Sequence, residues 1–201
     1  KAVPSISACD GGVDLAIVVV PAARVPGVIR ECAAADVKGI VLITAGFREI
    51  DDPGGAALHE EVQAIVDAAG IPVIGPNTFG MINFMADLNA SFTPEFSLLH
   101  KGSVALISQS GGISHLLGFM AMRMDLGFRM IVGLGNRLNV DFPQMIAFLA
   151  DDPENVHLAP VVRLGDRLMA GLAQLHANCV RPDLLDGRAN VLDALLRDVG
   201  R

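Results

Sequence analysis

The stretch Gly102-Ser103-Val104-Ala105-Leu106-Ile107-Ser108-Gln109-Ser110-Gly111-Gly112 shows the strand-to-helix succession on which the whole chain is built. Apolar, partly β-branched residues give way to small polar residues and two glycines, and a helix-forming segment, Ile113 to Met122, follows. This order is typical of an anion site, because the first backbone N–H groups of a helix are unpaired and carry partial positive charge. The hydroxyls of Ser108 and Ser110 can add donors, and glycine allows a phosphate to come close. An ordinary strand-to-helix turn with a serine cap explains the same residues equally well.

Upstream of this stretch, apolar runs alternate with segments of helical periodicity. We expect strands at residues 15–20, 39–44 and 71–74, and helices at residues 25–35 and 56–69. Continuous apolar runs are typical of parallel strands that are buried on both faces. The alternation predicts a parallel sheet with helices on its faces, which places the chain in the α/β class.

Downstream, the same rhythm continues and predicts a second, smaller sheet. We expect the helix that follows Gly112 to run to about residue 126, a strand at 129–132, a helix at 142–150 capped by Asp141, and a strand at 156–162. The irregular segment around Pro94 predicts a domain boundary near Ser97. The expected domains are therefore residues 1–97 and 98–162. Residues 163–201, with helices expected at 166–176 and 189–199, form a divergent helical tail or the remnant of a further subdomain.

Small and turn-forming residues follow each of the first three predicted strands. In open α/β sheets, ligands bind outside the carboxyl ends of the strands. The residues expected to gather at that edge are Pro21, Ala22, Ala45, Gly46, Phe47 and Asn77. Ordinary βα turns are also rich in Gly, Pro and Asn, so the pattern alone leaves a purely structural role open.

The composition argues against several function classes. The net charge is −7 with no basic run, and Trp and Tyr are absent, which argues against nucleic acid and anionic membranes as partners. Hydrophobic residues make up 52% of the chain and charged residues only 18%, so we expect another subunit or a missing part of the chain to cover part of the surface. The longest apolar run, residues 13–23, contains Asp14 and Pro21 and is too short to cross a bilayer.

The cysteines indicate a reducing compartment. Cys9, Cys32 and Cys179 lie far apart and form no CxxC pair, so neither a metal site nor a disulfide framework is expected. No signal peptide is visible, and a cytoplasmic location fits.

Five segments of the chain, spread over residues 13–162, resemble the nucleoside-diphosphate-forming (NDP-forming) acyl-CoA synthetases, relatives of the succinyl-CoA synthetase α subunit. They are Val13-Asp14-Leu15-Ala16-Ile17 through Pro21-Ala22; Ile43-Thr44-Ala45-Gly46-Phe47; Gly75-Pro76-Asn77-Thr78-Phe79-Gly80 with Asn83; Leu88-Asn89-Ala90-Ser91-Phe92; and Ser108-Gln109-Ser110-Gly111-Gly112, followed by Gly135-Asn136 and Asp151-Asp152-Pro153. The segments occur in the order that is found in the family.

The resemblance implies a truncated Rossmann-like CoA-binding domain, whose N-terminal glycine-rich unit is missing before Lys1, followed by a flavodoxin-like ligase domain. It implies that coenzyme A lies against Pro21, Ala22, Ala45, Gly46, Phe47, Pro76 and Asn77. It implies that phosphate is held by Ser108, Gln109, Ser110, Gly111 and Gly112.

The family's chemistry implies further partners. A histidine is phosphorylated, and the phosphate passes between an acyl phosphate and a nucleotide that an ATP-grasp domain holds. The expected substrates are CoA and a small carboxylic acid. ATP or ADP with Mg would enter only through an ATP-grasp domain or subunit, which this chain does not contain.

The chain also departs from the family pattern. It lacks the Ser-His-Thr-Gly-like context of the phosphorylated histidine, and Arg163-Leu164-Gly165-Asp166 stands where an acidic residue is expected. His115, four residues after Gly111, is the candidate surrogate phospho-acceptor, unless it is a partly buried helix histidine. A non-catalytic CoA-binding, regulatory or assembly module is therefore the alternative to a synthetase chain.

Overall fold

The computed structural model describes residues 2–150 and 157–161, and these residues form two β-sheets with helices packed on them. The expected helices at 166–176 and 189–199, and with them the whole segment 163–201, lie outside the described residues. None of the helices in the described part combines the length and the apolar character needed to cross a bilayer.

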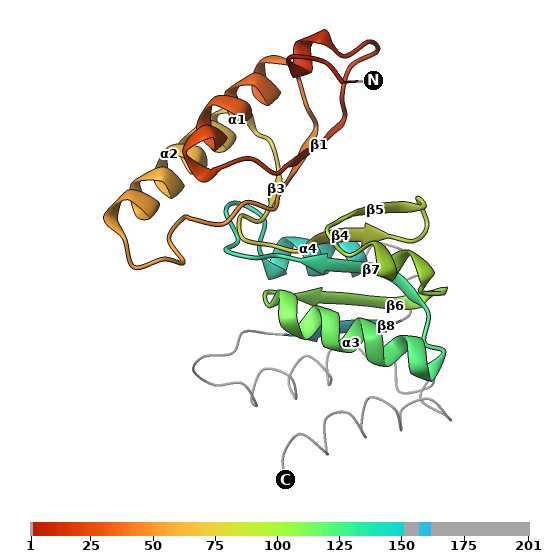
Figure 1. Cartoon of the computed structure of the whole chain (residues 1–201). Helices are drawn as coiled ribbons and strands as arrows, with labels where there is room; N and C mark the ends of the chain where they lie inside the picture. Colours follow the sequence, from red (N-terminus) through yellow and green to blue (C-terminus); the bar gives the residue numbers. More distant parts are fainter. Residues whose placement is uncertain (1, 151–156, 162–201) are drawn as a thin grey trace. The chain divides into compact units, whose positions relative to one another are not determined.

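The first sheet is parallel, as the sequence predicts. Its strands are β1 (Leu15–Val18), β2 (Gly39–Leu42) and β3 (Val73–Ile74), in that spatial order. Helix α1 (Val25–Ala34) connects β1 to β2, and α2 (Pro53–Ala69) connects β2 to β3. The two helices lie side by side (Figure 1), and both contribute to one apolar core with the strands.

The periodicity of α1 explains its position. Val25, Ile29 and Cys32 recur at helical spacing and are buried against strand residues such as Ile40 and Leu42. An apolar stripe of this kind drives a helix onto a sheet, because it removes apolar surface from water.

Strands β1 and β2 end two residues earlier than expected. Beyond Leu42, the side chain of Thr44 replaces the backbone ladder, since its hydroxyl donates to the carbonyl of Val20 at 2.8 Å and accepts from the N–H of Val20 at 3.3 Å. The side-chain bridge satisfies the backbone groups at the edge of the sheet while freeing the following loop from strand geometry.

The second sheet is mixed and has five strands. They are β4 (Gly80–Asn83), β5 (Leu88–Ser91), β6 (Lys101–Ser108), β7 (Phe128–Gly133) and β8 (His157–Val161), in the spatial order β5-β4-β7-β6-β8. β6 pairs in parallel with β7 and β8, whereas β4 is antiparallel to both β7 and β5.

The hairpin of β4 and β5 is a difference from the sequence-based expectation. Residues 80–91 carry no strong strand pattern and were assigned to the first domain, 1–97, but β4 pairs with β7, with Met81 opposite Val132. The change from one sheet to the other therefore falls between Ile74 and Gly80 instead of near Ser97. Pairing with β7 decides this placement, and such long-range pairing is invisible to local periodicity.

Helices cover both faces of the second sheet. Alternate residues of β6 point to opposite faces: Leu106 joins the core under α3 (Gly111–Met124), whereas Ala105 and Ile107 join the core under α4 (Phe142–Ala150). The α3 boundaries match the expected helix closely, and α4 matches the expected residues 142–150. This arrangement leaves the loops at the carboxyl ends of β6 and β7 free to form a site.

Helix α3 packs unusually closely on Phe96. A methyl group added at Gly118 would lie 2.4 Å from Cζ of Phe96, whose side chain is fully buried. Glycine is required at this point because the ring has no room to retreat.

We expect Gly118→Ala to lower the free energy of unfolding by about 2 kcal/mol, because the overpacking cost exceeds the gain in helix propensity. The matched control is Gly27→Ala in α1, where an added methyl group meets nothing within 4 Å. This control should stabilise the chain by about 0.5–1 kcal/mol. Urea denaturation of both variants measures the effect, and equal stabilisation by the two substitutions would contradict the packing described here.

Candidate functional site

The turn between β6 and α3 is held together from its inner side. Ser108 is completely buried, and its hydroxyl donates to the carbonyl of Ser110 at 3.0 Å and accepts from the N–H of Ser110 at 3.1 Å. Ser110 is the N-cap of α3, and its hydroxyl accepts from the N–H of Ile113 at 3.4 Å. Ser108 thus shapes the turn, whereas Gly111 and Gly112 form the first helical positions, whose N–H groups have no intrahelical acceptor.

An open pocket of about 660 Å³ lies at this helix start. Seven of the predicted site residues line it: Ala45, Asn77, Gln109, Ser110, Gly111, Gly112 and His115. The pocket therefore brings residues of the predicted CoA edge together with residues of the predicted phosphate turn. At the helix start the pocket is lined by the backbone N–H groups of Gly111 and Gly112 and by no long side chain, which suits an anionic group.

The other predicted CoA residues do not line the pocket. Phe47 is fully buried in the core of the first sheet, and the carbonyl of Pro76 accepts from the N–H of Asn136 at 2.8 Å. Ala22 and Gly46 nevertheless adjoin each other, since a Cβ at Gly46 would lie 3.1 Å from that of Ala22. The carbonyl of Pro21 accepts from the N–H of Arg24 at 2.8 Å and starts a short 3-10 helix.

Four residues that were not predicted complete the pocket: Ile43, Thr78, Phe79 and Phe92. Thr78 donates its hydroxyl to the carbonyl of Gly133 and accepts from the N–H of Gly80 at 3.0 Å, so it joins the end of β7 to the start of β4. The signal that could have identified Thr78 and Phe79 is their position directly after Pro76-Asn77. Phe92 ends the family-like segment Leu88–Phe92, but its approach to the pocket depends on the β4–β5 hairpin, which local periodicity does not predict.

His115 is engaged at both ring nitrogens. Nδ1 lies 2.6 Å from the carbonyl oxygen of Gly111, and Nε2 lies 2.6 Å from the hydroxyl of Thr93. A carbonyl only accepts, so Nδ1 carries a proton, and in the neutral ring Nε2 accepts from Thr93.

The His115 ring is also enclosed by aromatic side chains. Phe92 stacks on it at a centroid distance of 5.7 Å, Phe79 approaches edge-on at 5.5 Å, and Phe96 lies at 5.3 Å. A nucleophilic nitrogen needs an accessible lone pair, and here the Nε2 lone pair faces Thr93. The surroundings of His115 therefore favour a role in holding the helix start and the segment around Thr93 together.

The loop after β2 is organised by a carboxylate. Glu49 accepts hydrogen bonds from the N–H groups of Gly46 and Phe47 and from the side-chain amide of Asn136. Burial by itself raises the pKa of the Glu49 carboxyl, but these hydrogen bonds outweigh burial and the pKa lies below its ordinary value. Glu49 is therefore ionised at neutral pH and closes the loop that carries Ala45.

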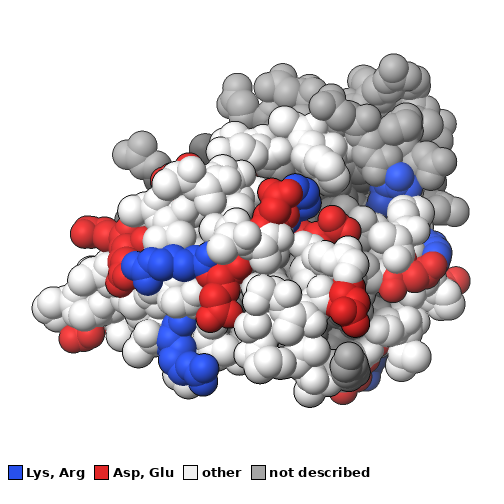
Figure 2. All heavy atoms as spheres, turned by 90° about the horizontal axis from the view of Figure 1, so that it is seen from above, with Lys and Arg blue, Asp and Glu red and all other residues white. Residues whose placement is uncertain are grey.

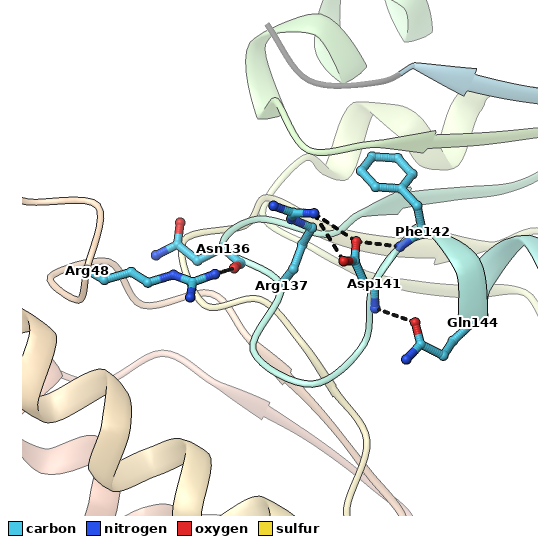
Figure 3. Close-up of polar contacts among 6 residues, drawn as sticks. All are labelled: Arg48, Asn136, Arg137, Asp141, Phe142 and Gln144. Atoms are coloured by element: carbon cyan, nitrogen blue, oxygen red, sulfur yellow. Dashed lines mark hydrogen bonds and ion pairs between the residues drawn. The ribbon is translucent and has the colours of Figure 1, made fainter. Parts of the chain in front are cut away.

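Asp141 caps α4, as the sequence predicts. Its carboxylate accepts from the N–H of Phe142 at 2.6 Å and pairs with Arg137 at 3.0 Å, while its own N–H donates to the side chain of Gln144 at 3.2 Å (Figure 3). Burial by itself raises the pKa of Asp141. The Phe142 N–H and the Arg137 guanidinium together lower this pKa by more, so it lies below its ordinary value. The Gln144 bond is one half of a capping box, whereas the Asp141 carboxylate binds the first N–H of the helix, that of Phe142, instead of the third.

Charge and metal ligands are sparsely distributed. Within the described residues, no three His, Cys, Asp or Glu side chains come together in a way that could hold a metal ion. On the face shown in Figure 2, Lys and Arg side chains are scattered beside acidic ones and do not gather into one patch. An anion at the pocket would therefore depend on backbone N–H groups and the helix dipole.

Two family models match the chain. Residues 1–83 match the CoA binding domain, and residues 101–168 match the succinyl-CoA ligase like flavodoxin domain. The α/β expectation, with a parallel-sheet CoA-binding domain followed by a flavodoxin-like domain, is confirmed.

Curated and solved relatives agree with these models. The chain is 39% identical over 159 residues to the α subunit of acetate–CoA ligase [ADP-forming] II of Pyrococcus furiosus, covering 79% of this chain and 34% of that protein. It is 34% identical to the dinucleotide forming acetyl-coenzyme A synthetase 1 of Ca. Korarchaeum cryptofilum, solved with phosphate and ADP, with a TM-score of 0.76. That match covers 87% of this chain and 36% of the synthetase.

The chain is also similar in sequence and fold to a Pyrococcus horikoshii protein whose crystal structure is known. It is 36% identical with a TM-score of 0.76, and the match covers 83% of this chain and 37% of that one. The chain thus spans about a third of the length of these relatives.

We expect Glu49→Gln to destabilise the chain at neutral pH, because the amide replaces a carboxylate that accepts from three donors. A carboxyl with a lowered folded-state pKa stabilises above its unfolded pKa of about 4.3, and this stabilisation is lost as the pH falls through the folded-state pKa. The difference in unfolding free energy between the wild type and Glu49→Gln should therefore be largest above pH 5 and shrink in more acidic buffer. Urea titrations at several pH values measure it, and a difference that is independent of pH would contradict the assignment.

Proposed function

The chain belongs to the family of NDP-forming acyl-CoA synthetases, and we propose that it acts as an α-type chain of such a synthetase, binding CoA and phosphate. The reaction would be acyl-CoA plus nucleoside diphosphate plus phosphate giving the free acid, CoA and nucleoside triphosphate, or its reverse. A phosphohistidine would carry the phosphoryl group between the acyl phosphate and the nucleotide. The acid would be a small carboxylic acid, and the cysteines and composition fit a cytoplasmic location.

One observation supports this proposal above the others. The glycine-rich start of α3 and the loops after β2 and β3 line the same pocket, through Gly111, Ala45 and Asn77. CoA at the strand-end loops and phosphate at the helix start would then be neighbours, as the transfer of an acyl group between them requires.

The main role of this chain in the proposed reaction would be to position CoA and phosphate. In phosphoryl transfer, catalysis consists largely of orienting the groups and stabilising the negative charge on the phosphoryl oxygens. The first N–H groups of α3 and the hydroxyl of Ser110 would serve an anion in this way. An ATP-grasp domain or subunit would hold the nucleotide with Mg, which agrees with the greater length of the relatives.

The environment of His115 favours a second candidate function. Because Thr93 and Gly111 engage both ring nitrogens, His115 would hold the helix start and would not accept the phosphate. A chain without another phospho-acceptor would be a non-catalytic CoA-binding or regulatory module.

Ligand binding is tested by calorimetry with CoA and with inorganic phosphate. We expect the wild type to bind both, and Gly111→Val to lose at least tenfold in phosphate affinity, because the side chain occupies the helix start where the anion would lie. Gly27→Val, on the outer face of α1, is the matched control and should leave both affinities unchanged. Phosphate binding that survives Gly111→Val would remove the turn from the proposed site.

Phosphorylation separates the two candidate functions. The chain is incubated with γ-labelled ATP, with and without an ATP-grasp subunit of an ADP-forming synthetase, and acid-labile label on histidine is measured. A synthetase chain should acquire label in the presence of that subunit, and His115→Gln should keep it if His115 is structural. Absence of label under every condition, together with CoA binding, would identify the binding module.

A further inference from the structure

Asn136 lies in the loop after β7 and is connected to two other loops by every polar group it has. Its N–H donates to the carbonyl of Pro76 at 2.8 Å, and its carbonyl accepts from Nη2 of Arg48 at 2.6 Å (Figure 3). Its side-chain amide donates to Glu49, and its side-chain oxygen accepts from Nδ2 of Asn77 at 3.3 Å. Only 9% of Asn136 is exposed, although the side chains of Arg48, Glu49 and Asn77 reach the surface.

The partners of Asn136 shape the pocket from two sides. Asn77 lines the pocket itself, in the loop after β3. Glu49 holds the N–H groups of Gly46 and Phe47, and the residue before them, Ala45, also lines the pocket. One amide therefore sets the separation of the two loops proposed to contact CoA.

The backbone on either side of the Asn136 contacts adopts left-handed conformations. Gly135 has a φ of +56°, and a Cβ there would lie 2.2 Å from the carbonyl oxygen of Pro76. Asn77 also has a positive φ of 56°, held by its N–H bond to the carbonyl of Thr44 at 2.9 Å. Glycine adopts this conformation without strain, whereas the left-handed conformation of Asn77 is disfavoured and is kept by the surrounding bonds.

An amide is the side chain that fits these two partners. It donates to the Glu49 carboxylate and accepts from the Asn77 amide at the same time. A carboxylate at position 136 would face Glu49 with like charge, and an apolar side chain would remove the bonds that tie Asn136 to Glu49 and Asn77.

We propose that Asn136 is a positioning residue of the synthetase site, which fixes Asn77 and the Ala45–Glu49 loop for CoA while leaving the phosphate turn unaffected. The inference rests on the proposed function. The hydroxyls of Ser108 and Ser110 hold the phosphate turn from within. The N–H of Leu134 also donates to the Ser108 carbonyl at 2.8 Å, a backbone bond that does not involve the side chain of Asn136.

The test compares Asn136→Ala with Asn139→Ala in the full chain. Asn139 is a matched control, because its side chain also bridges to the segment around β3, donating to the carbonyl of Ile71 and accepting from the N–H of Val73, both at 2.9 Å. It lies outside the pocket lining. Calorimetry with CoA and with inorganic phosphate, and urea denaturation, are carried out on each variant.

We expect Asn136→Ala to weaken CoA binding at least tenfold and to leave phosphate affinity within about twofold of the wild type. Asn139→Ala should lower stability while leaving both affinities unchanged. If Asn136→Ala does not fold, Asn136→Asp keeps the shape of the side chain and replaces its donor by a second carboxylate beside Glu49, and the same CoA result is expected.

Two outcomes overturn the inference in distinguishable ways. Unchanged CoA affinity in the Asn136 variants, with the wild type binding CoA, would show that Asn136 serves stability alone. No CoA binding by the wild-type chain would overturn the proposed function and, with it, this inference.

Discussion

Parallel strand pairing is the constraint on which the candidate site depends. Strands β1 to β3 run in one direction, and β6 runs in parallel with β7, so each set presents its carboxyl ends at a single edge. The loops that follow these ends supply Ala45, Asn77 and the turn at Gly111, which line one pocket. The direction of the strands therefore brings these loops to the same edge, whatever their side chains. Side-chain contacts such as those of Asn136 then connect the loops to one another.

Hydrogen-bond satisfaction distinguishes the residues that build this pocket from those available to a ligand. The Ser108 hydroxyl and both nitrogens of His115 are engaged within the protein, whereas the helix-start glycines present backbone N–H groups that no helical carbonyl reaches. Residues that are equally polar in the sequence thus have different roles in the structure. The proposed function requires a phosphohistidine, and the contacts of both His115 nitrogens argue against this residue as the phospho-acceptor.

Much of the fold follows from local patterns. The helices α1, α2, α3 and α4 and the strands β1, β2, β3, β6, β7 and β8 all lie where periodicity and apolar runs predict them. The β4–β5 hairpin does not, because Gly80, Asn83 and Asn89 are weak strand formers and the hairpin is stabilised by pairing with β7. The strand-end residues of the pocket were predicted. Thr78 was missed although it follows Pro76-Asn77 directly, and Phe92 was missed because its position depends on that hairpin.

The sequence by itself determined the α/β class, the strand-to-helix turn at Ser108–Gly112 and the family, because these depend on residue type and order along the chain. Only the tertiary structure decided that Phe47 is buried, that Ser108 bonds back onto Ser110, and that Asn136 joins the loops after β2 and β3. The physical reason is that burial and hydrogen-bond partners are set by residues distant in sequence, such as Asn136 and Glu49, which are 87 positions apart. A local pattern can name the residues of a site, but packing assigns their roles.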